Sequence, residues 1–346
     1  MKSAIWTPEA DLTVVEAEQP TPGPGEIVVA MRSAGICGSD LHRYHRAEDP
    51  PSGQPGHEDG GIVSAVGAGV DHVREGDVVG IEPIVRCTTC DRCRAGWYMQ
   101  CRETPFTILG ERRPGGMAEY MLAPGYTAYP APRGVDAELA ALAEPVACSV
   151  NAIDLVDVQA GETVLILGAG NIGLSGVLAL RAAGAKVLIT ARYAHQAEAA
   201  RRLGADEVIP ADASGVPRLK ELRAQEAVDV VFESVGGSAD TLADGMRTVR
   251  PRGRVVMLGV FTTPRVSVNP FDLLLHEIQL TGAVTYGTPP GRRAHFAEAL
   301  DVVAQYPEET RSLVTHRFPL DEVSQAFATA ADKGQKSIKV HINPSA

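Results

Sequence analysis

The pattern of apolar positions changes near residue 137. Before that point, short apolar runs lie between glycines and prolines, at 27–31, 62–66 and 78–81. Runs of this length and punctuation are typical of β-strands. From there on, Leu139, Leu142 and Val146 recur at the spacing of one helix face, and the predicted helix continues beyond Cys148. The first third of the chain is therefore predicted to be rich in β-structure.

Strands and helices alternate after residue 161. The predicted strands are 164–167, 187–190, 228–232 and 255–258, and the predicted helices are 172–183, 196–203 and 242–249. Such alternation indicates βαβ units, hence a parallel sheet covered by helices. The end of the chain is predicted as two helices, at 295–305 and 320–331, followed by a strand at 337–342.

These patterns predict an α/β protein with two domains. A chain of 346 residues exceeds the size at which one hydrophobic core usually stops growing, about 250 to 300 residues. We expect a β-rich catalytic domain built from 1–149 and 286–346. A Rossmann-type domain with a doubly wound parallel sheet is expected as an insertion at 150–285.

The net charge of −11 would repel nucleic acids and anionic membrane surfaces, so neither is an expected partner. The segment 1–11 carries Glu9 and Asp11 and has no apolar run typical of a signal peptide. Glycines interrupt the uncharged stretch 163–180, which argues against a membrane span. We therefore expect a cytoplasmic protein that acts on a small molecule.

A glycine motif follows the first strand of the predicted parallel sheet. Gly168, Gly170 and Gly173 form G-x-G-x-x-G, and Asn171 and Ile172 open the helix. The first glycine permits a tight turn, the second lets a pyrophosphate approach the backbone, and the third allows close packing of helix on strand. Free N–H groups at the helix start then bind the phosphates. The motif predicts a dinucleotide site.

The end of the next strand selects the cofactor. A carboxylate about 20 residues after the glycines would bind the ribose 2′-hydroxyl of NAD. This chain instead reads Ala191, Arg192, Tyr193. An arginine without a neighbouring acid suits a 2′-phosphate, so the sequence favours NADP over NAD. The alternative is an arginine that is merely solvated.

Four cysteines, Cys87, Cys90, Cys93 and Cys101, lie within fifteen residues with the spacing C-x2-C-x2-C-x7-C. Four thiolates on a short loop close a tetrahedral shell, which is typical of structural zinc. An iron–sulfur cluster uses similar ligands, but nothing else in the chain indicates electron transfer. We expect a structural zinc ion here.

A second group of metal-binding residue types surrounds Cys37 and His57. Asp40, His42 and Glu58 lie near them, in the segments CGSDLH and GHE. A catalytic zinc needs about three protein ligands and one open position. With Glu144 from the later helix, Cys37 and His57 would provide the three.

These motifs together resemble the zinc-containing medium-chain dehydrogenase/reductase family, which includes alcohol, sorbitol and threonine dehydrogenases. The resemblance covers nearly the whole chain. Its signature G-H-E-x2-G-x5-G-x2-V is met by Gly56, His57, Glu58, Gly61, Gly67 and Val70. The cysteine loop, the glycine motif, VRPRGRVVMLG at 249–259 and the terminal segment 338–340 follow the family's order.

The resemblance implies a GroES-like catalytic domain in which Cys37 and His57 bind catalytic zinc and Asp40 orients a ligand imidazole. The third ligand is a cysteine in many simple alcohol dehydrogenases and an acid in polyol and threonine enzymes. The pair Glu144–Pro145 resembles the polyol branch, which favours Glu144, directly or through a water. Cys148 is the second choice, and Glu58 approaches the metal transiently.

The implied activity is oxidation of a secondary alcohol or polyol, or reduction of the matching ketone. Zinc as a Lewis acid lowers the pKa of the alcohol, Ser39 takes the alcohol proton, and His42 forms the solvent end of a relay. The resemblance also implies homotetramers or homodimers. It implies two zinc ions per chain, one catalytic and one structural.

Two departures from the family pattern stand out. Polyol and threonine relatives usually carry an acid where this chain has Ala191. The segment 110–120 is unusually charged, and its Arg112 and Arg113 would either contact an acidic or phosphorylated substrate or lie in a solvated loop.

Three other functions fit parts of the sequence. One is an NAD-dependent polyol or amino-alcohol dehydrogenase, and another is a non-catalytic relative that binds zinc and NADP. A zinc-free enoyl or quinone reductase of the same superfamily would lack both sets of metal ligands.

Overall fold

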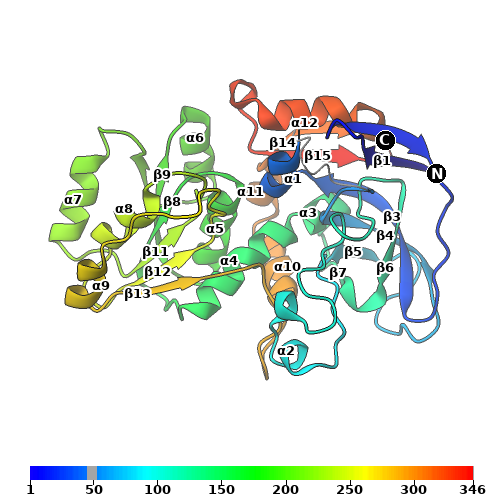
Figure 1. The fold of residues 1–346 in the computed structure, drawn as a ribbon, viewed down its shortest axis with the longest axis horizontal. Helices are drawn as coiled ribbons and strands as arrows, with labels where there is room; N and C mark the ends of the chain where they lie inside the picture. The colour runs from blue at the N-terminus through cyan, green and yellow to red at the C-terminus, as the bar shows by residue number, and fades with distance from the viewer. Residues whose placement is uncertain (45–52, 346) are drawn as a thin grey trace. The chain divides into compact units, whose positions relative to one another are not determined.

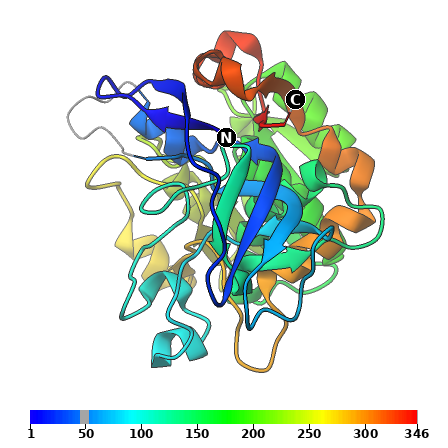
Figure 2. The ribbon, with the colours of Figure 1, turned by 90° about the vertical axis from the view of Figure 1, so that its right-hand side faces the viewer.

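The fold is described from a computed structural model, which covers residues 1–44 and 53–345. The chain divides into two compact units (Figure 1), one of Met1–Glu144 with Gly287–Ala346 and the other of Pro145–Tyr286. The expected boundaries were 149/150 and 285/286. Both ends of the chain belong to the first unit (Figure 2). Within the described residues, no helix combines the length and the apolar character that a membrane crossing requires.

In its described part, the first unit contains a seven-stranded sheet in the order β14-β15-β3-β4-β5-β7, with β6 paired to β3. The strands are β3 (Glu26–Gly35), β4 (Glu58–Val66), β5 (Val78–Ile81), β6 (Tyr120–Pro124), β7 (Ala128–Pro130), β14 (Val314–Pro319) and β15 (Lys339–Asn343). A separate antiparallel pair consists of β1 (Lys2–Trp6) and β2 (Leu12–Glu16). Since β15 pairs with β3, strands from the N-terminal and C-terminal parts of the chain form one sheet.

The register between β3 and β4 brings two candidate metal ligands close together. Gly35, the last residue of β3, pairs with Glu58, the first residue of β4. Cys37 follows β3 by two residues and His57 immediately precedes β4. Because the strands are antiparallel, the end of one meets the start of the other. The two predicted ligands therefore arrive at the same end of the sheet.

The helices of the first unit are short. They are α1 (Gly38–Arg43), α2 (Asp91–Arg94), α3 (Ala137–Ala141), α10 (His295–Gln305), α11 (Pro307–Arg311) and α12 (Val323–Ala331), with 3₁₀ turns at Tyr98–Gln100, Gly125–Thr127, Leu320–Glu322 and Lys333–Gln335.

The helix predicted from residue 137 is divided. It forms α3 and then α4 (Ala143–Leu155), which begins at the boundary between the units. Pro145 has no N–H to bond the carbonyl of Ala141, and proline is tolerated in the first turn of a helix but not in its interior. The apolar spacing across residue 142 reflects burial on two consecutive helices rather than on one.

The second unit is a parallel sheet in the order β10-β9-β8-β11-β12-β13, six strands among the described residues. Its strands are β8 (Thr163–Leu167), β9 (Lys186–Ala191), β10 (Glu207–Pro210), β11 (Val230–Glu233), β12 (Arg254–Met257) and β13 (Gln279–Gly282). Its helices are α5 (Asn171–Ala182), α6 (Ala194–Arg202), α7 (Val216–Ala224), α8 (Thr241–Thr248) and α9 (Pro270–His276). The Rossmann-type parallel sheet is thus confirmed. The two edge strands, β10 and β13, were missed because each is short and partly polar.

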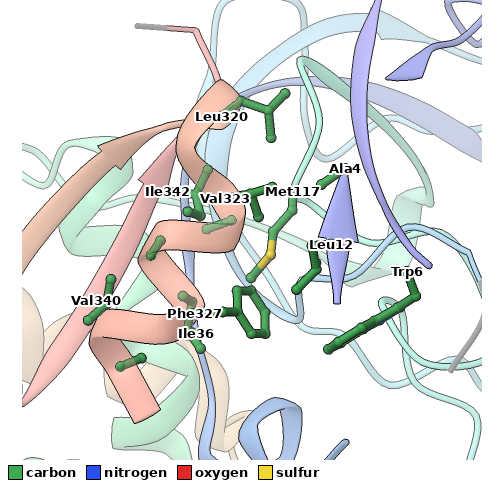
Figure 3. Packing of buried hydrophobic residues seen from close by; sticks show 13 residues of the cluster. Ala4, Trp6, Leu12, Ile36, Met117, Leu320, Val323, Phe327, Val340 and Ile342 are labelled. Carbon is green, nitrogen blue, oxygen red and sulfur yellow. The ribbon is translucent and has the colours of Figure 1, made fainter. Parts of the chain in front are cut away.

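One core of the first unit joins the two ends of the chain (Figure 3). Trp6 from β1 and Phe327 from α12 meet edge to face, with ring centroids 5.5 Å apart and planes at 83°. Met117 and Ile342 belong to the same buried cluster. Phe327 is fully buried, so this aromatic residue contributes much of the apolar area that holds α12 in place.

Replacing Phe327 with Ala is expected to lower the free energy of unfolding by about 3 to 5 kcal/mol, because it removes buried apolar contacts and leaves a cavity. Denaturant unfolding followed by circular dichroism measures the change. Phe106→Ala is the control, since that ring lies in the same unit and is 54% exposed. Equal stability of the two variants would refute the importance of this core.

Candidate functional site

The four predicted cysteines converge on one point. The Sγ atoms of Cys87, Cys90, Cys93 and Cys101 all lie within 4.8 Å of one another. The backbone N–H of Cys87 donates to the sulfur of Cys101 at 3.4 Å, and the N–H of Cys90 donates to the sulfur of Cys87 at 3.3 Å. The N–H of Cys93 donates to the sulfur of Cys90 at 3.4 Å. Such bonds favour thiolates.

The pKa values of these thiols are consistent with a bound cation. Burial and the neighbouring thiols raise the pKa of Cys93 to about 12. Burial also opposes ionisation of Cys101, but hydrogen bonds from Thr104 and from backbone N–H groups outweigh it and lower the pKa to about 5. Four sulfurs this close become thiolates together only when a metal ion balances their charge. The donor set and its spacing fit a closed tetrahedral site.

A second cluster lies where β3 ends and β4 begins. Ligand atoms of Cys37, His57 and Glu58 lie within 4.8 Å of one another. His57 is buried, and its Nδ1 has no hydrogen-bond partner among the described residues. A buried polar atom without a partner is costly, and the Asp40 carboxylate lies 3.7 Å from this nitrogen. The other ring nitrogen, Nε2, lies 3.4 Å from the Ser39 hydroxyl.

Negative groups surround the His57 imidazole. Burial opposes its positive charge, but Asp40, Cys37 and Glu144 raise the pKa of His57 well above the usual value. The Asp40 carboxylate stands 3.7 Å from Nδ1 and also accepts the backbone N–H of Cys37 at 2.9 Å. Asp40 therefore contacts both the backbone of Cys37 and the imidazole ring of His57.

Glu58 is held by a lysine from the far end of the chain. The Lys339 ammonium lies 2.5 Å from the Glu58 carboxylate and donates to the carbonyl of Ile36 at 2.9 Å. Both side chains are almost fully buried. Burial alone would neutralise them, but each holds the other charged: Lys339 lowers the pKa of Glu58 and Glu58 raises that of Lys339. In the sequence, Lys339 stands out only as part of the terminal segment 338–340 that follows the family's order. The sequence feature that could have indicated its role is a lysine placed between apolar residues of a predicted strand.

Glu144 lies in the first turn of α4 and is buried. Its negative charge raises the pKa of both His57 and Lys339. The group of ligand atoms within 4.8 Å contains Glu58 and not Glu144. Cys148 follows Glu144 by four residues on the same helix, and residues with this spacing share a face. The identity of the third ligand stays a prediction.

Ser39 and His42 lie on α1. The Ser39 hydroxyl is 3.4 Å from Nε2 of His57, and His42 is exposed in the last turn of the helix. Their i, i+3 spacing places them on one helix face. Ser39 therefore lies beside the buried His57, and His42 lies on the same helix face where it is exposed to solvent.

The three motif glycines have three different surroundings. Gly168 has φ of +100°, which favours glycine, and a Cβ on Gly173 would lie 1.9 Å from the carbonyl oxygen of Gly168. A Cβ on Gly170 would have no atom within 4 Å. The turn, the close packing and the open approach expected for a pyrophosphate are therefore all present. α5 begins at Asn171 with no side-chain cap from Gly170, so its first N–H groups suit an anion.

The end of β9 stands beside this glycine turn. β8 and β9 are parallel with Ile166 opposite Ile189, and the N–H of Gly168 donates to the Thr190 hydroxyl at 2.9 Å. Arg192 follows β9 and is exposed, with its guanidinium 5.6 Å from the ring centre of Tyr193. In the described part of the chain it forms no ion pair. A positive charge is thus available where the ribose of a dinucleotide would lie.

Glu233 and Ser234 were missed by the sequence analysis. One Glu233 oxygen accepts the N–H groups of Val235 and Gly236, each at 2.9 Å, and the Thr241 hydroxyl at 2.7 Å. The Ser234 hydroxyl lies 2.9 Å from the carbonyl oxygen of Leu167 and 3.0 Å from that of Gly168. These residues after β11 support the glycine turn. The only sequence feature that could have indicated their role is an acid at the end of an apolar strand.

Family comparisons agree with this arrangement. Residues 23–133 match the alcohol dehydrogenase GroES-like domain, and residues 171–305 match the zinc-binding dehydrogenase domain. L-threonine 3-dehydrogenase from Pyrococcus furiosus is 32% identical over 333 residues, which cover 92% of each chain.

Solved structures show the same fold over the whole chain. A zinc-binding dehydrogenase from Sinorhizobium meliloti 1021 bound to NADP is 32% identical, with a TM-score of 0.88 and 99% of each chain covered. Galactitol-1-phosphate dehydrogenase from Escherichia coli is 26% identical, with a TM-score of 0.90, covering 99% of this chain and 100% of that one. Given the two domain matches and the threonine dehydrogenase relative, the chain belongs to the zinc-dependent alcohol dehydrogenases of the medium-chain dehydrogenase/reductase family.

Proposed function

We propose that this enzyme transfers a hydride between NADP and a secondary alcohol or polyol, or the matching ketone in reverse, with catalytic and structural zinc. The observation that carries the proposal is the convergence of Cys37, His57 and acidic side chains at one buried point. A protein that only bound NADP would have no need for such a cluster. A zinc-free reductase would lack both clusters.

Cys37, His57 and Glu144 would hold the catalytic zinc. Glu58 is the less suitable third ligand, because its charge is already balanced by Lys339 at 2.5 Å. Glu144 is buried in the first turn of α4, and its negative charge acts on His57. Bound zinc supplies Lewis-acid chemistry that lowers the pKa of the alcohol. Cys148 is the alternative to Glu144.

The remaining residues position groups and move the proton. Asp40 orients His57 from 3.7 Å, in the manner of an acid that supports a ligand imidazole. Ser39 receives the proton of the substrate hydroxyl, and His42, exposed on the same helix, passes it to solvent. Cys87, Cys90, Cys93 and Cys101 would hold the structural zinc.

NADP is favoured over NAD by the strand end beside the glycine turn. Ala191 removes the carboxylate that would repel a 2′-phosphate, and Arg192 offers a charged partner for it. The relative from Sinorhizobium meliloti was solved with NADP. The alternative, an NAD-dependent polyol or amino-alcohol dehydrogenase, draws on the threonine dehydrogenase relative. A cytoplasmic location and a homotetramer or homodimer are proposed on the family resemblance alone.

The catalytic zinc is tested with Cys37→Ala, His57→Ala and Glu144→Ala. Each variant is expected to bind one zinc per chain instead of two and to lose at least about 100-fold in kcat/KM, because an incomplete shell binds the ion weakly. Elemental analysis and steady-state rates measure both effects, and circular dichroism checks the fold. Cys148→Ala is the control, expected to keep both ions. Loss of zinc in that variant with retention in Glu144→Ala would assign the third ligand to Cys148.

Cofactor choice is tested with Arg192→Ala. Loss of a charged hydrogen bond of about 1.5 to 3 kcal/mol is expected to raise KM for NADP by about 10- to 100-fold and to leave KM for NAD nearly unchanged. Arg201→Ala, an exposed arginine on α6, is the matched control. Equal changes with both cofactors would contradict the role of Arg192.

The structural zinc is tested with Cys93→Ser. This variant is expected to lose one zinc per chain and to melt at a lower temperature, since the metal holds the cysteine loop in its folded form. Calorimetry and elemental analysis provide the measurements. Arg94→Ala, an exposed neighbour on α2, should retain both properties. An unchanged melting temperature and zinc content in Cys93→Ser would rule out a metal at the four cysteines.

A further inference from the structure

Two arginines form the end of a tight turn at residues 108–113, here called the arginine turn. The carbonyl of Ile108 accepts the N–H groups of Glu111 and Arg112 at 3.2 and 3.1 Å, and the N–H of Gly110 donates to the carbonyl of Arg113 at 2.7 Å. Arg112 and Arg113 are both exposed. Their backbone is thus held in a defined conformation while their side chains face solvent.

The arginine turn is attached to the helix that follows Cys37. Glu111 forms an ion pair of 2.7 Å with Arg43, and both side chains are largely shielded. Arg43 is the last residue of α1, whose N-cap is Cys37. α1 has six residues, so Arg43 is about 9 Å along the helix axis from Cys37 at 1.5 Å per residue. The turn therefore lies near the first candidate ligand.

The same turn continues into a segment bonded to the residues that precede His57. The N–H of Gly115 donates to the carbonyl of Gln54 at 3.0 Å, and the N–H of Met117 donates to that of Pro55 at 2.9 Å. A Cβ on Gly110 would lie 2.2 Å from the carbonyl oxygen of Gly56, so only glycine permits this approach. The turn is thus packed directly against the residue before the second candidate ligand.

Chain connectivity limits how far the arginines lie from the metal site. Arg112 is two Cα steps from Gly110, at most about 7.6 Å, and His57 is one step of about 3.8 Å from Gly56. This separation is short enough for an arginine side chain and a substrate of several carbon atoms to span it together.

Neither arginine has an ion-pair partner in the described residues, whereas neighbouring Arg43 is neutralised by Glu111. The chain as a whole carries a net charge of −11, so two adjacent unpaired arginines form a local site for anions. The planar guanidinium group binds carboxylate and phosphate oxygens in pairs.

We propose that Arg112 and Arg113 bind an anionic group, a phosphate or a carboxylate, at the end of the substrate remote from the reacting hydroxyl. This proposal rests on the proposed function, of which it specifies the substrate class. The substrate is then an anionic alcohol or polyol rather than a neutral one, and the arginine turn determines specificity without taking part in the hydride transfer.

The test compares matched neutral and anionic substrates in the zinc-loaded enzyme. The pairs are galactitol with galactitol 1-phosphate and 2,3-butanediol with 3-hydroxybutyrate. In the double variant Arg112→Ala with Arg113→Ala, kcat/KM for the preferred anionic substrate is expected to fall at least about 10-fold, mainly through KM, since uniform binding is lost. Rates with neutral substrates should stay within about twofold. Arg133→Ala, an exposed arginine of the same unit, is the control and should change neither.

The comparison of the pairs also separates the two anions, because a phosphate site favours galactitol 1-phosphate and a carboxylate site favours 3-hydroxybutyrate. Preference of the unmodified enzyme for the neutral member of both pairs would overturn the proposal. An equal loss on neutral and anionic substrates in the double variant would also overturn it, since the turn would then be only structural.

A binding measurement distinguishes failure of this proposal from failure of the proposed function. Inorganic phosphate and acetate are titrated onto protein saturated with NADP and followed by nuclear magnetic resonance line broadening. Broadening of one anion by the unmodified protein, reduced at least about 10-fold in the double variant, supports the anion site even if no alcohol is oxidised. Equal broadening by both proteins would refute it even if the enzyme is an active dehydrogenase.

Discussion

The buried ion pair between Lys339 and Glu58 connects the parts of the candidate catalytic site. Lys339 comes from β15 and Glu58 begins β4. The lysine also donates to the carbonyl of Ile36, the residue that follows β3. Ile36 precedes Cys37 and Glu58 follows His57, so one ammonium group supports both candidate ligands. A Cβ on Gly35 would lie 2.4 Å from the Glu58 carboxylate, which leaves room for the pair only beside glycine. Removing one partner would leave a buried charge uncompensated, at a cost of about 3 to 5 kcal/mol.

This ion pair lies among several buried acidic side chains. Asp40, Glu58, Asp59 and Glu144 are all buried, and burial raises the pKa of Asp59 to about 8. Neither Asp59 oxygen has a hydrogen-bond partner within the described residues, and a Cβ on Gly116 would lie 2.1 Å from one of them. Packing several acids around a single imidazole is unfavourable without a cation. The metal ion proposed here would offset this cost.

The cofactor site follows a different principle. Its geometry comes from backbone: a glycine turn, a helix start and parallel strands in register. Side chains enter mainly as supports, such as Thr190 and Ser234, which bond the turn from either side. Because a glycine turn binds the part common to both dinucleotides, the proposed choice between NADP and NAD depends on the few side chains at the end of β9.

Features that depend on neighbours in sequence were predictable from the chain alone. The cysteine spacing, the glycine motif after an apolar strand and the strand and helix periods each involve a few residues. The structure brings the four thiols together, places the glycines at a turn and forms the expected strands and helices, with the exceptions that follow. The continuous helix expected from residue 137 was wrong because apolar spacing does not register the missing N–H of Pro145. The edge strands β10 and β13 were missed because β10 has a glutamate and a proline among its four residues and β13 has two polar residues and a glycine, whereas the buried central strands are nearly all apolar.

Tertiary structure alone decided the pairings between distant residues. Lys339 and Glu58 are 281 positions apart, and the turn that carries Arg112 meets the segment before His57 only through backbone bonds and glycine packing. Local periodicity carries no information about which strand end faces which, because register is chosen by the packing of the whole sheet. The sequence by itself determined which chemical groups this protein possesses, and the tertiary structure decided which of them share one buried, low-dielectric space where their charges act on each other.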